Sequence, residues 1–217
     1  MARGLNSGRL LPLFPLQLVV FPGSATPLHI FEERYREMVG EAETAGTEFG
    51  IVLVKDGGIV NSGCTVIVEA VLKRYDDGRF DVMTRGQRRF LIQAIDQEKD
   101  YLRGDVEYFN DESDEAAPPE LRRKAMAAFL QMRDALATQD TVVEGAPDDA
   151  SPLLSFELAD SIDDLDFRNM IQRSRSETER LRIFTDFTGA YIERRQYAAR
   201  MKRTAPMNGH GHKRVAE

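Results

Sequence analysis

The segment from Gly58 to Thr65 has the glycine spacing and the terminal hydroxyl residue of a phosphate-binding loop. Such a loop needs a lysine directly before the hydroxyl residue, because that lysine contacts the β- and γ-phosphates. Cys64 stands there instead, and the segment leads into a strand pattern rather than into a helix whose N-terminus would face an anion. We therefore expect a glycine-flanked β-turn and no nucleotide site.

Cys64 is the only cysteine, and His29 is the only histidine before the C-terminal tail. A nucleophilic cysteine needs a helix N-terminus or a fixed cation that lowers the pKa of its thiol. The sequence places neither beside Cys64, and the apolar neighbours of His29 favour a packed, hydrogen-bonded histidine. A small-molecule hydrolase that uses Cys64 is a third hypothesis, which unchanged activity in a Cys64→Ala variant would remove.

Other catalytic and metal-binding patterns are missing from the sequence. The acidic residues between Asp160 and Asp166 lack the spacing of a calcium loop. Neither a G-x-S-x-G elbow nor an H-E-x-x-H motif occurs. We therefore expect no catalytic residue, no bound metal and no cofactor.

Basic residues gather at two places in the sequence. Arg85, Arg88 and Arg89 lie close together on a predicted strand, where they could bind phosphate or pair with acidic neighbours such as Asp81. Seven basic residues and no acidic residue lie between Arg194 and Arg214. The net charge of -7 argues against a protein whose whole surface binds nucleic acid, although a local patch stays open.

The composition is that of a soluble globular chain. Hydrophobic residues make up 42% and charged residues 30% of the 217 residues, which excludes wholesale disorder. An apolar run from Leu10 to Phe21 resembles a secretory signal, but Pro12, Pro15 and Pro22 would break its helix. We expect no membrane segment and a cytoplasmic protein.

The first half of the sequence predicts strands and one helix. Alternation over Leu16–Val20 predicts a buried strand, and apolar residues at helical spacing from Phe31 to Ala45 predict a helix that Gly46 ends. A continuous apolar run over 49–54 predicts a strand buried on both faces, and Asp76–Gly78 predicts a hairpin turn. Further strands are predicted over 65–73, 80–84, 88–95 and 101–109. Such short, closely spaced strands favour an antiparallel barrel or sandwich.

The second half predicts helices. A polar, proline-containing linker (110–120) precedes an apolar helical stripe from Leu121 to Leu136. Ser176 and Glu179 have the spacing of a capping box, which would open a last helix that runs to about Arg203. Shorter helices are predicted around 154–162 and 165–173. The predicted organisation is a β-barrel subdomain over 1–112, a helical bundle over 113–203 and a disordered tail over 204–217.

The segment LPLFPLQLVVFPGSATPLHIFEERYREMV (11–39) resembles the opening of the Lon N-terminal, or substrate-binding, domain. The matching features are the proline-flanked strand, the FPG turn, the PL pair and the F-x-x-R-Y helix start. Similarities continue in FGIVLV, in the strand that begins near Gly63, in the G-x-R-R-F segment (86–90), around Gln172 and in Glu179–Leu181. Because they occur in the same order, the resemblance spans nearly the whole chain.

The resemblance implies an α+β fold. Its expected parts are a PUA-like antiparallel β-pseudobarrel with one or two short helices and a C-terminal α-helical bundle. In full-length Lon proteases an ATPase module and a Ser-Lys peptidase domain follow this region. The sequence contains neither a complete phosphate loop nor residues that could form a peptidase domain, so we expect a stand-alone, non-enzymatic protein.

The leading hypothesis is a protein-binding module. It would capture unfolded or specific proteins or peptides in a groove between barrel and helices, where an extended apolar chain loses water. A protease or ATPase acting in trans is a further candidate partner. The candidate lining residues are Phe14, Leu28, Phe31 and Tyr35, each of which could instead be a plain core residue.

The alternative hypothesis is binding of RNA or DNA. PUA-like barrels bind RNA in other proteins, and here Arg85, Arg88 and Arg89, together with the basic stretch between Arg194 and Arg214, would form the contact surface. Affinity for a labelled oligonucleotide that falls steeply as salt rises would favour this hypothesis.

Overall fold

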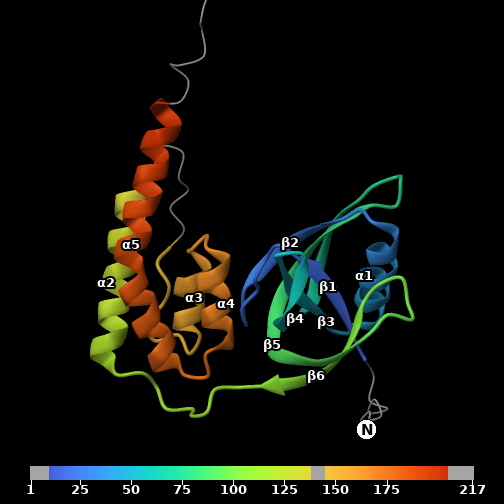
Figure 1. The fold of residues 1–217 in the computed structure, drawn as a ribbon. Coiled ribbons are helices and arrows are strands. Elements are labelled where there is room, and N and C mark those ends of the chain that lie inside the picture. Colours follow the sequence, from blue (N-terminus) through green and yellow to red (C-terminus); the bar gives the residue numbers. More distant parts are fainter. Residues whose placement is uncertain (1–9, 138–144, 205–217) are drawn as a thin grey trace, which may run out of the picture.

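A computed structural model describes residues 10–137 and 145–204 as a mixed six-stranded sheet with five helices (Figure 1). The strands are β1 (Leu11–Leu16), β2 (Ala25–Ile30), β3 (Phe49–Lys55), β4 (Gly58–Arg74), β5 (Phe80–Asp96) and β6 (Arg103–Phe109). The helices are α1 (Glu33–Ala45), α2 (Pro119–Leu136), α3 (Leu154–Asp160), α4 (Leu165–Arg173) and α5 (Glu177–Thr204). The class is α+β, as the sequence predicts.

The strand pairings form a closed circuit. The order across the sheet is β2-β5-β4-β3-β1-β6, and β6 also pairs with β5, so β2 alone lies outside the circuit. The prediction of a wholly antiparallel sheet is wrong for one pair, because β1 and β3 are parallel. Between them the chain passes through β2 and α1, which gives it the length that a parallel return requires.

Two long, bent strands dominate the sheet. β4 and β5 have 17 residues each and are joined at the predicted turn, where Gly78 has a φ of 84°. The predicted strand over 88–95 is therefore not separate but the second half of β5. Several register shifts between β4 and β5 bend the pair without breaking it. The predicted turn at 58–65 is also wrong, since the chain turns at Asp56–Gly57 and these residues already belong to β4.

Helix α1 covers one side of the sheet, away from the other helices (Figure 1). Its buried residues include Tyr35, Met38 and Ala42, which belong to the predicted apolar face. Gly46 ends the helix in the left-handed conformation with a φ of 61°. This face and the inner residues of the strands form one hydrophobic core.

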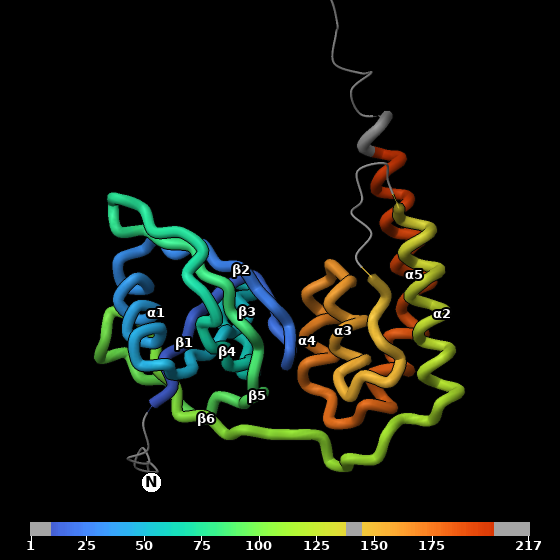
Figure 2. Tube along the Cα trace, turned by 180° about the vertical axis from the view of Figure 1, so that it is seen from behind, coloured from blue at the N-terminus to red at the C-terminus, as the bar shows by residue number. Residues whose placement is uncertain are grey.

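The remaining helices form a second group. α2 and α5 lie side by side, and α3 and α4 lie between this pair and the sheet (Figures 1 and 2). Ser176 caps α5 as predicted, because its hydroxyl accepts from the backbone N–H of Glu179 at 3.3 Å. The reciprocal half of the capping box is absent, since the Glu179 carboxylate instead accepts from the Ser174 hydroxyl at 2.6 Å.

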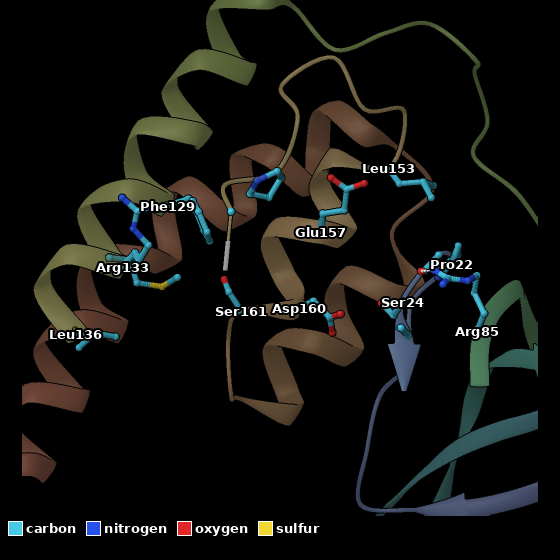
Figure 3. Close-up of a pocket in the computed structure, with 15 residues that line it drawn as sticks. Pro22, Ser24, Arg85, Phe129, Arg133, Leu136, Leu153, Glu157, Asp160 and Ser161 are labelled. Carbon is cyan, nitrogen blue, oxygen red and sulfur yellow. Dashed lines mark hydrogen bonds between the residues drawn. The ribbon is translucent and has the colours of Figure 1, made fainter. Parts of the chain in front are cut away.

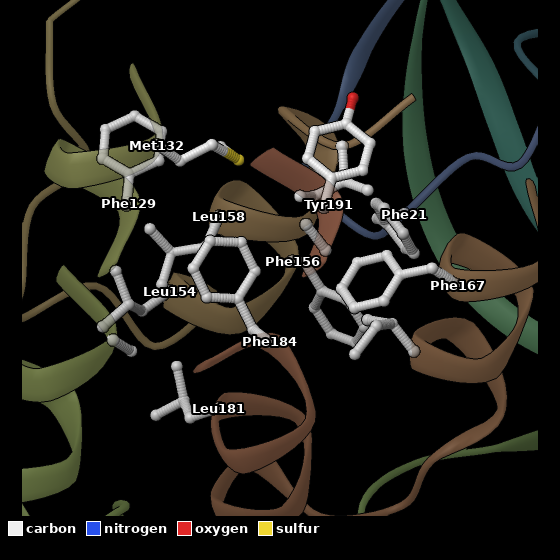
Figure 4. Packing of buried hydrophobic residues seen from close by; sticks show 14 of the residues in the cluster. Phe21, Phe129, Met132, Leu154, Phe156, Leu158, Phe167, Leu181, Phe184 and Tyr191 are labelled. Atoms are coloured by element: carbon white, nitrogen blue, oxygen red, sulfur yellow. The ribbon is translucent and has the colours of Figure 1, made fainter. Parts of the chain in front are cut away.

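Residues 17–24, here called the joint segment, link β1 to β2 and pack against the helical group. The predicted strand over Leu16–Val20 is wrong because β1 ends at Leu16 and the joint segment enters the helical core (Figure 4). Phe21 is fully buried and stacks on Phe156 of α3 with ring centroids 5.5 Å apart. Arg168 and Gln172 of α4 donate to the carbonyls of residues 19 and 20, each at 2.8 Å. The sheet and the helices therefore share one packed junction.

Across the described residues, the structure contains no helix with the length and apolar character needed to cross a membrane. The tail predicted over 204–217 lies, from residue 205 onward, outside the described residues.

A candidate binding cavity between the sheet and the helices

A cavity of about 890 Å³ opens between the start of β2 and the helices α2 and α3 (Figure 3). Pro22, Ala25 and Arg85 line its sheet side. Leu153, just before α3, lies next to the joint segment, because an ideal Cβ on Gly23 would come within 2.7 Å of its side chain. The joint segment thus brings the sheet and the helices together at one edge of the cavity.

One face of α2 forms the opposite wall. Phe129, Met132 and Leu136 recur at helical spacing, so their side chains lie along one side of the helix and contribute to the lining. Phe129 and Met132 also belong to the hydrophobic core of the helices, and Leu136 packs against it. The apolar wall is thus held in place by the core behind it.

The charged residues of the cavity have partners within the protein. Arg85 binds the Glu69 carboxylate and donates to the Gly23 carbonyl at 2.9 Å. Asp160 accepts from Arg168 at 2.5 Å. On α3, the Glu157 carboxylate accepts a hydrogen bond from the Ser151 hydroxyl at 2.6 Å. On α2, the Arg133 guanidinium forms an ion pair with Asp134 at 3.3 Å. The cavity therefore combines apolar surface with charges that are already paired.

None of the four predicted partner-binding residues lines this cavity. Phe14, Leu28 and Tyr35 are at most 9% exposed and belong to the core beneath α1, where the rings of Phe14 and Tyr35 lie 4.2 Å apart. Phe31 is 60% exposed and stacks beside His29 at 5.9 Å. Three of the four residues are therefore core residues and Phe31 is a surface residue, whereas the cavity is lined by α2 and the joint segment.

The three arginines of the predicted nucleic-acid patch each have an acidic partner. Arg85 pairs with Glu69, as described above. Arg88 pairs with Glu48 at 2.9 Å, and its guanidinium stacks 3.9 Å from the Tyr108 ring. Arg89 is 5% exposed and lies in the junction between sheet and helices. The structure therefore does not bring the three side chains together as one free basic surface.

Arg89 belongs to a buried ion network that the sequence did not reveal. Asp111, on the linker after β6, accepts from Arg89 at 2.6 Å and from both terminal nitrogens of Arg180 at 2.6 and 2.7 Å. Burial alone would raise the pKa of the Asp111 carboxyl, but hydrogen bonds from and charges on Arg180 and Arg89 outweigh it and lower the pKa. Asp111 thus ties β5 and α5 to the linker. In the sequence, Asp111 is one of several acidic residues in the linker (110–120), and nothing distinguishes it from the others.

Cys64 and His29 do not form a nucleophilic pair. Cys64 lies opposite Arg89 on β5 and His29 lies opposite Asp81, eight residues away, which is a separation on the order of 25 Å along a strand. Burial raises the pKa of the Cys64 thiol to about 12. The His29 Nδ1 instead lies 2.5 Å from the Asp81 carboxylate.

The buried thiol gives a direct prediction. At pH 8, native Cys64 should react with a thiol reagent about a thousandfold more slowly than in urea, because a pKa near 12 leaves little thiolate. The release of nitrothiobenzoate from Ellman's reagent would measure both rates. Similar rates with and without urea would show that Cys64 is accessible and would reopen the hydrolase hypothesis.

Comparisons with known proteins agree on one domain type. Residues 10–180 match the model of the family described as the ATP-dependent protease La (LON) substrate-binding domain. A Lon N-terminal domain protein from Xanthomonas campestris is similar in structure, with 26% sequence identity, a TM-score of 0.63 and coverage of 80% of this chain and 95% of that chain. The N-terminal domain of the Mycobacterium avium complex Lon protease has a similar fold, with 18% identity, a TM-score of 0.58 and coverage of 83% and 98%.

Proposed function

We propose, from the premise that this chain belongs to the LON substrate-binding domain family, that it binds proteins without transforming them chemically. The family match confirms the resemblance seen in the sequence. Membership of the family implies a role in the recognition of protein substrates. The more specific part of the proposal is the site, namely the cavity between β2 and α2. The ligand is an unfolded or extended apolar segment of another protein.

The observation that carries this proposal is the apolar cavity with paired charges. Its volume of about 890 Å³ lies in the range of sites that enclose a small ligand or a few side chains. Leu136 and Leu153 are only partly buried and offer apolar surface that loses contact with water when a ligand binds, whereas Phe129 and Met132, 9% and 3% exposed, form the packed core behind that surface. Because Arg85 and Asp160 already have partners, a neutral side chain can enter without leaving either charge unpaired.

The two-part architecture supports the same proposal. We interpret the closed circuit of strands as the PUA-like pseudobarrel and α2 to α5 as the helical bundle. The subdomain boundary near residue 112 then falls at the linker that carries Asp111. A binding site at a junction of two such parts is common in proteins, since the junction leaves concave surface.

An alanine-to-tryptophan substitution tests the site. Ala25 is exposed at the cavity, so Ala25→Trp should fill part of the cavity and weaken the binding of fluorescein-labelled casein, an unfolded protein, by about tenfold. Fluorescence anisotropy would measure the affinity. Ala70→Trp is the matched control, since Ala70 is an exposed alanine on β4 outside the cavity.

Two outcomes of the casein-binding measurement would contradict parts of the proposal. Equal binding by wild type and both variants would contradict the placement of the site in the cavity. No binding of casein by the wild-type protein would contradict capture of unfolded chains. The nucleic-acid alternative is tested in the same instrument with a labelled oligonucleotide, and the paired arginines give no reason to favour it.

A further inference from the structure

The orientation of β2 shows which of its backbone groups face β5. Gly86 donates its backbone N–H to the carbonyl of Ser24 at 3.0 Å. Hydrogen-bonded and non-bonded pairs alternate along an antiparallel ladder, so the backbone groups of Thr26 and Leu28 also face β5. The groups of the intervening residues must then point away from the sheet.

Ala25, Pro27 and His29 are these intervening residues. β2 stands at one end of the strand order, and among the described residues it pairs with β5 alone. Proline is tolerated in a sheet where its missing N–H faces away from the neighbouring strand, and Pro27 occupies such a position. The open edge of β2 therefore offers two N–H groups and three carbonyls.

The open edge begins inside the cavity. Ser24 and Ala25 line the cavity together with the α2 wall, and the helical group lies beside β2 in two opposite views (Figures 1 and 2). A folded sheet or a second copy of this chain would have to bring its own neighbouring strands to this edge. The cavity that α2 and α3 share with the start of β2 has a volume of about 890 Å³, a size that suits a few side chains of one extended segment rather than a folded domain.

We propose that an extended apolar segment of a protein substrate adds to the open edge of β2 as an extra strand, with one end in the cavity. Backbone hydrogen bonds to the edge would give affinity that depends little on sequence, and alternate side chains would enter the cavity. Phe31 directly follows β2 and is 60% exposed, so it offers apolar surface at the other end of the strand. This inference rests on the proposed function and specifies how the segment binds.

Pro27 makes the inference testable by a gain of affinity. Pro27→Val adds the missing outward N–H, which should tighten the binding of an extended peptide by about three- to tenfold. The probe is a fluorescein-labelled ten-residue peptide that alternates leucine and serine. Thr26→Val is the matched control, because it adds the same side chain on β2 but changes no backbone donor. Equal melting temperatures would show that both variants fold.

Methylation of the peptide backbone gives a second readout. One version of the probe carries N-methyl groups on the leucines and another carries them on the serines. Strand addition predicts that one version loses at least about tenfold in affinity while the other binds nearly as the parent does, since alternate N–H groups face the edge. Unchanged affinity in Pro27→Val and equal effects of the two methylation patterns would overturn strand addition. If Ala25→Trp still weakened the binding of the unmethylated peptide, the proposed function would stand without strand addition. If the wild-type protein bound neither the unmethylated peptide nor casein, both the proposed function and strand addition would be overturned.

Discussion

Replacing Gly86 by alanine is expected to lower the free energy of unfolding by at least about 3 kcal/mol, at the upper end of the cost of overpacking. An ideal Cβ on Gly86 would lie 1.9 Å from the backbone oxygen of Phe21 and 3.1 Å from a Val20 methyl. A backbone atom cannot move aside as a flexible side chain can. The joint segment would have to leave β5, which would withdraw Phe21 from its stack on Phe156.

Thermal unfolding followed by circular dichroism would measure this effect. A loss of this size corresponds to a melting temperature lower by roughly 6–12 °C for a chain of this length. Gly40→Ala is the matched control, because the added Cβ in the middle of α1 would have no atom within 4 Å apart from its chain neighbours and the backbone of its own helix. That variant should be as stable as the wild type or slightly more stable, since alanine favours helix. A Gly86→Ala protein with the same melting temperature as the wild type would contradict the close packing of the joint segment against β5.

Replacing Asp111 by alanine is expected to destabilise the protein by about 3–5 kcal/mol, the usual cost of removing one partner of a buried ion pair. Arg180 and Arg89 are 2% and 5% exposed; without Asp111, Arg180 would keep the Glu177 carboxylate at 2.9 Å, whereas Arg89 would stay buried and lose its carboxylate partner. Urea unfolding would measure the loss. Asp114→Ala is the matched control, because Asp114 lies exposed on the same linker. Equal stability of the two variants would contradict the role of the network.

The network also predicts a pH dependence. The pKa of Asp111 is lower in the folded protein than its ordinary value, so its stabilising contribution is present above about pH 4 and is lost as the pH falls through the folded pKa. The wild-type protein should therefore lose more unfolding free energy between pH 5 and pH 2 than Asp111→Ala does. Parallel curves for the two proteins would show that Asp111 is not held by the arginines.

Local patterns in the sequence were sufficient for most of the secondary structure. The face of α1, the turn at Gly78, the bounds of α4 and the Ser176 cap follow from residue types within a few positions. The parallel pairing of β1 and β3 did not follow, because it depends on how a long connection returns to the sheet. The long β5 strand was divided in the prediction because a bend and a break look alike in an alternating pattern.

The candidate site was much harder to predict than the elements. Apolar residues such as Phe14 and Tyr35 follow the patterns that mark buried faces, and the structure places both in a core. Met132 belonged to a predicted helical stripe, but only the packing of α2 near the joint segment makes it part of a cavity wall. Exposure of Phe31 depends on where α1 begins, which is among the least certain features of a sequence pattern.

Photo-crosslinking tests the location of the substrate most directly. An apolar peptide that carries benzoylphenylalanine at its centre would be irradiated with the intact protein, and mass spectrometry would identify the attached residues. The proposal predicts crosslinks on α2, just before α3 and at the start of β2, with Leu136, Leu153 and Ala25 as principal sites, and their loss in Ala25→Trp. Crosslinks concentrated on α1 or spread evenly over the surface would contradict substrate binding in this cavity.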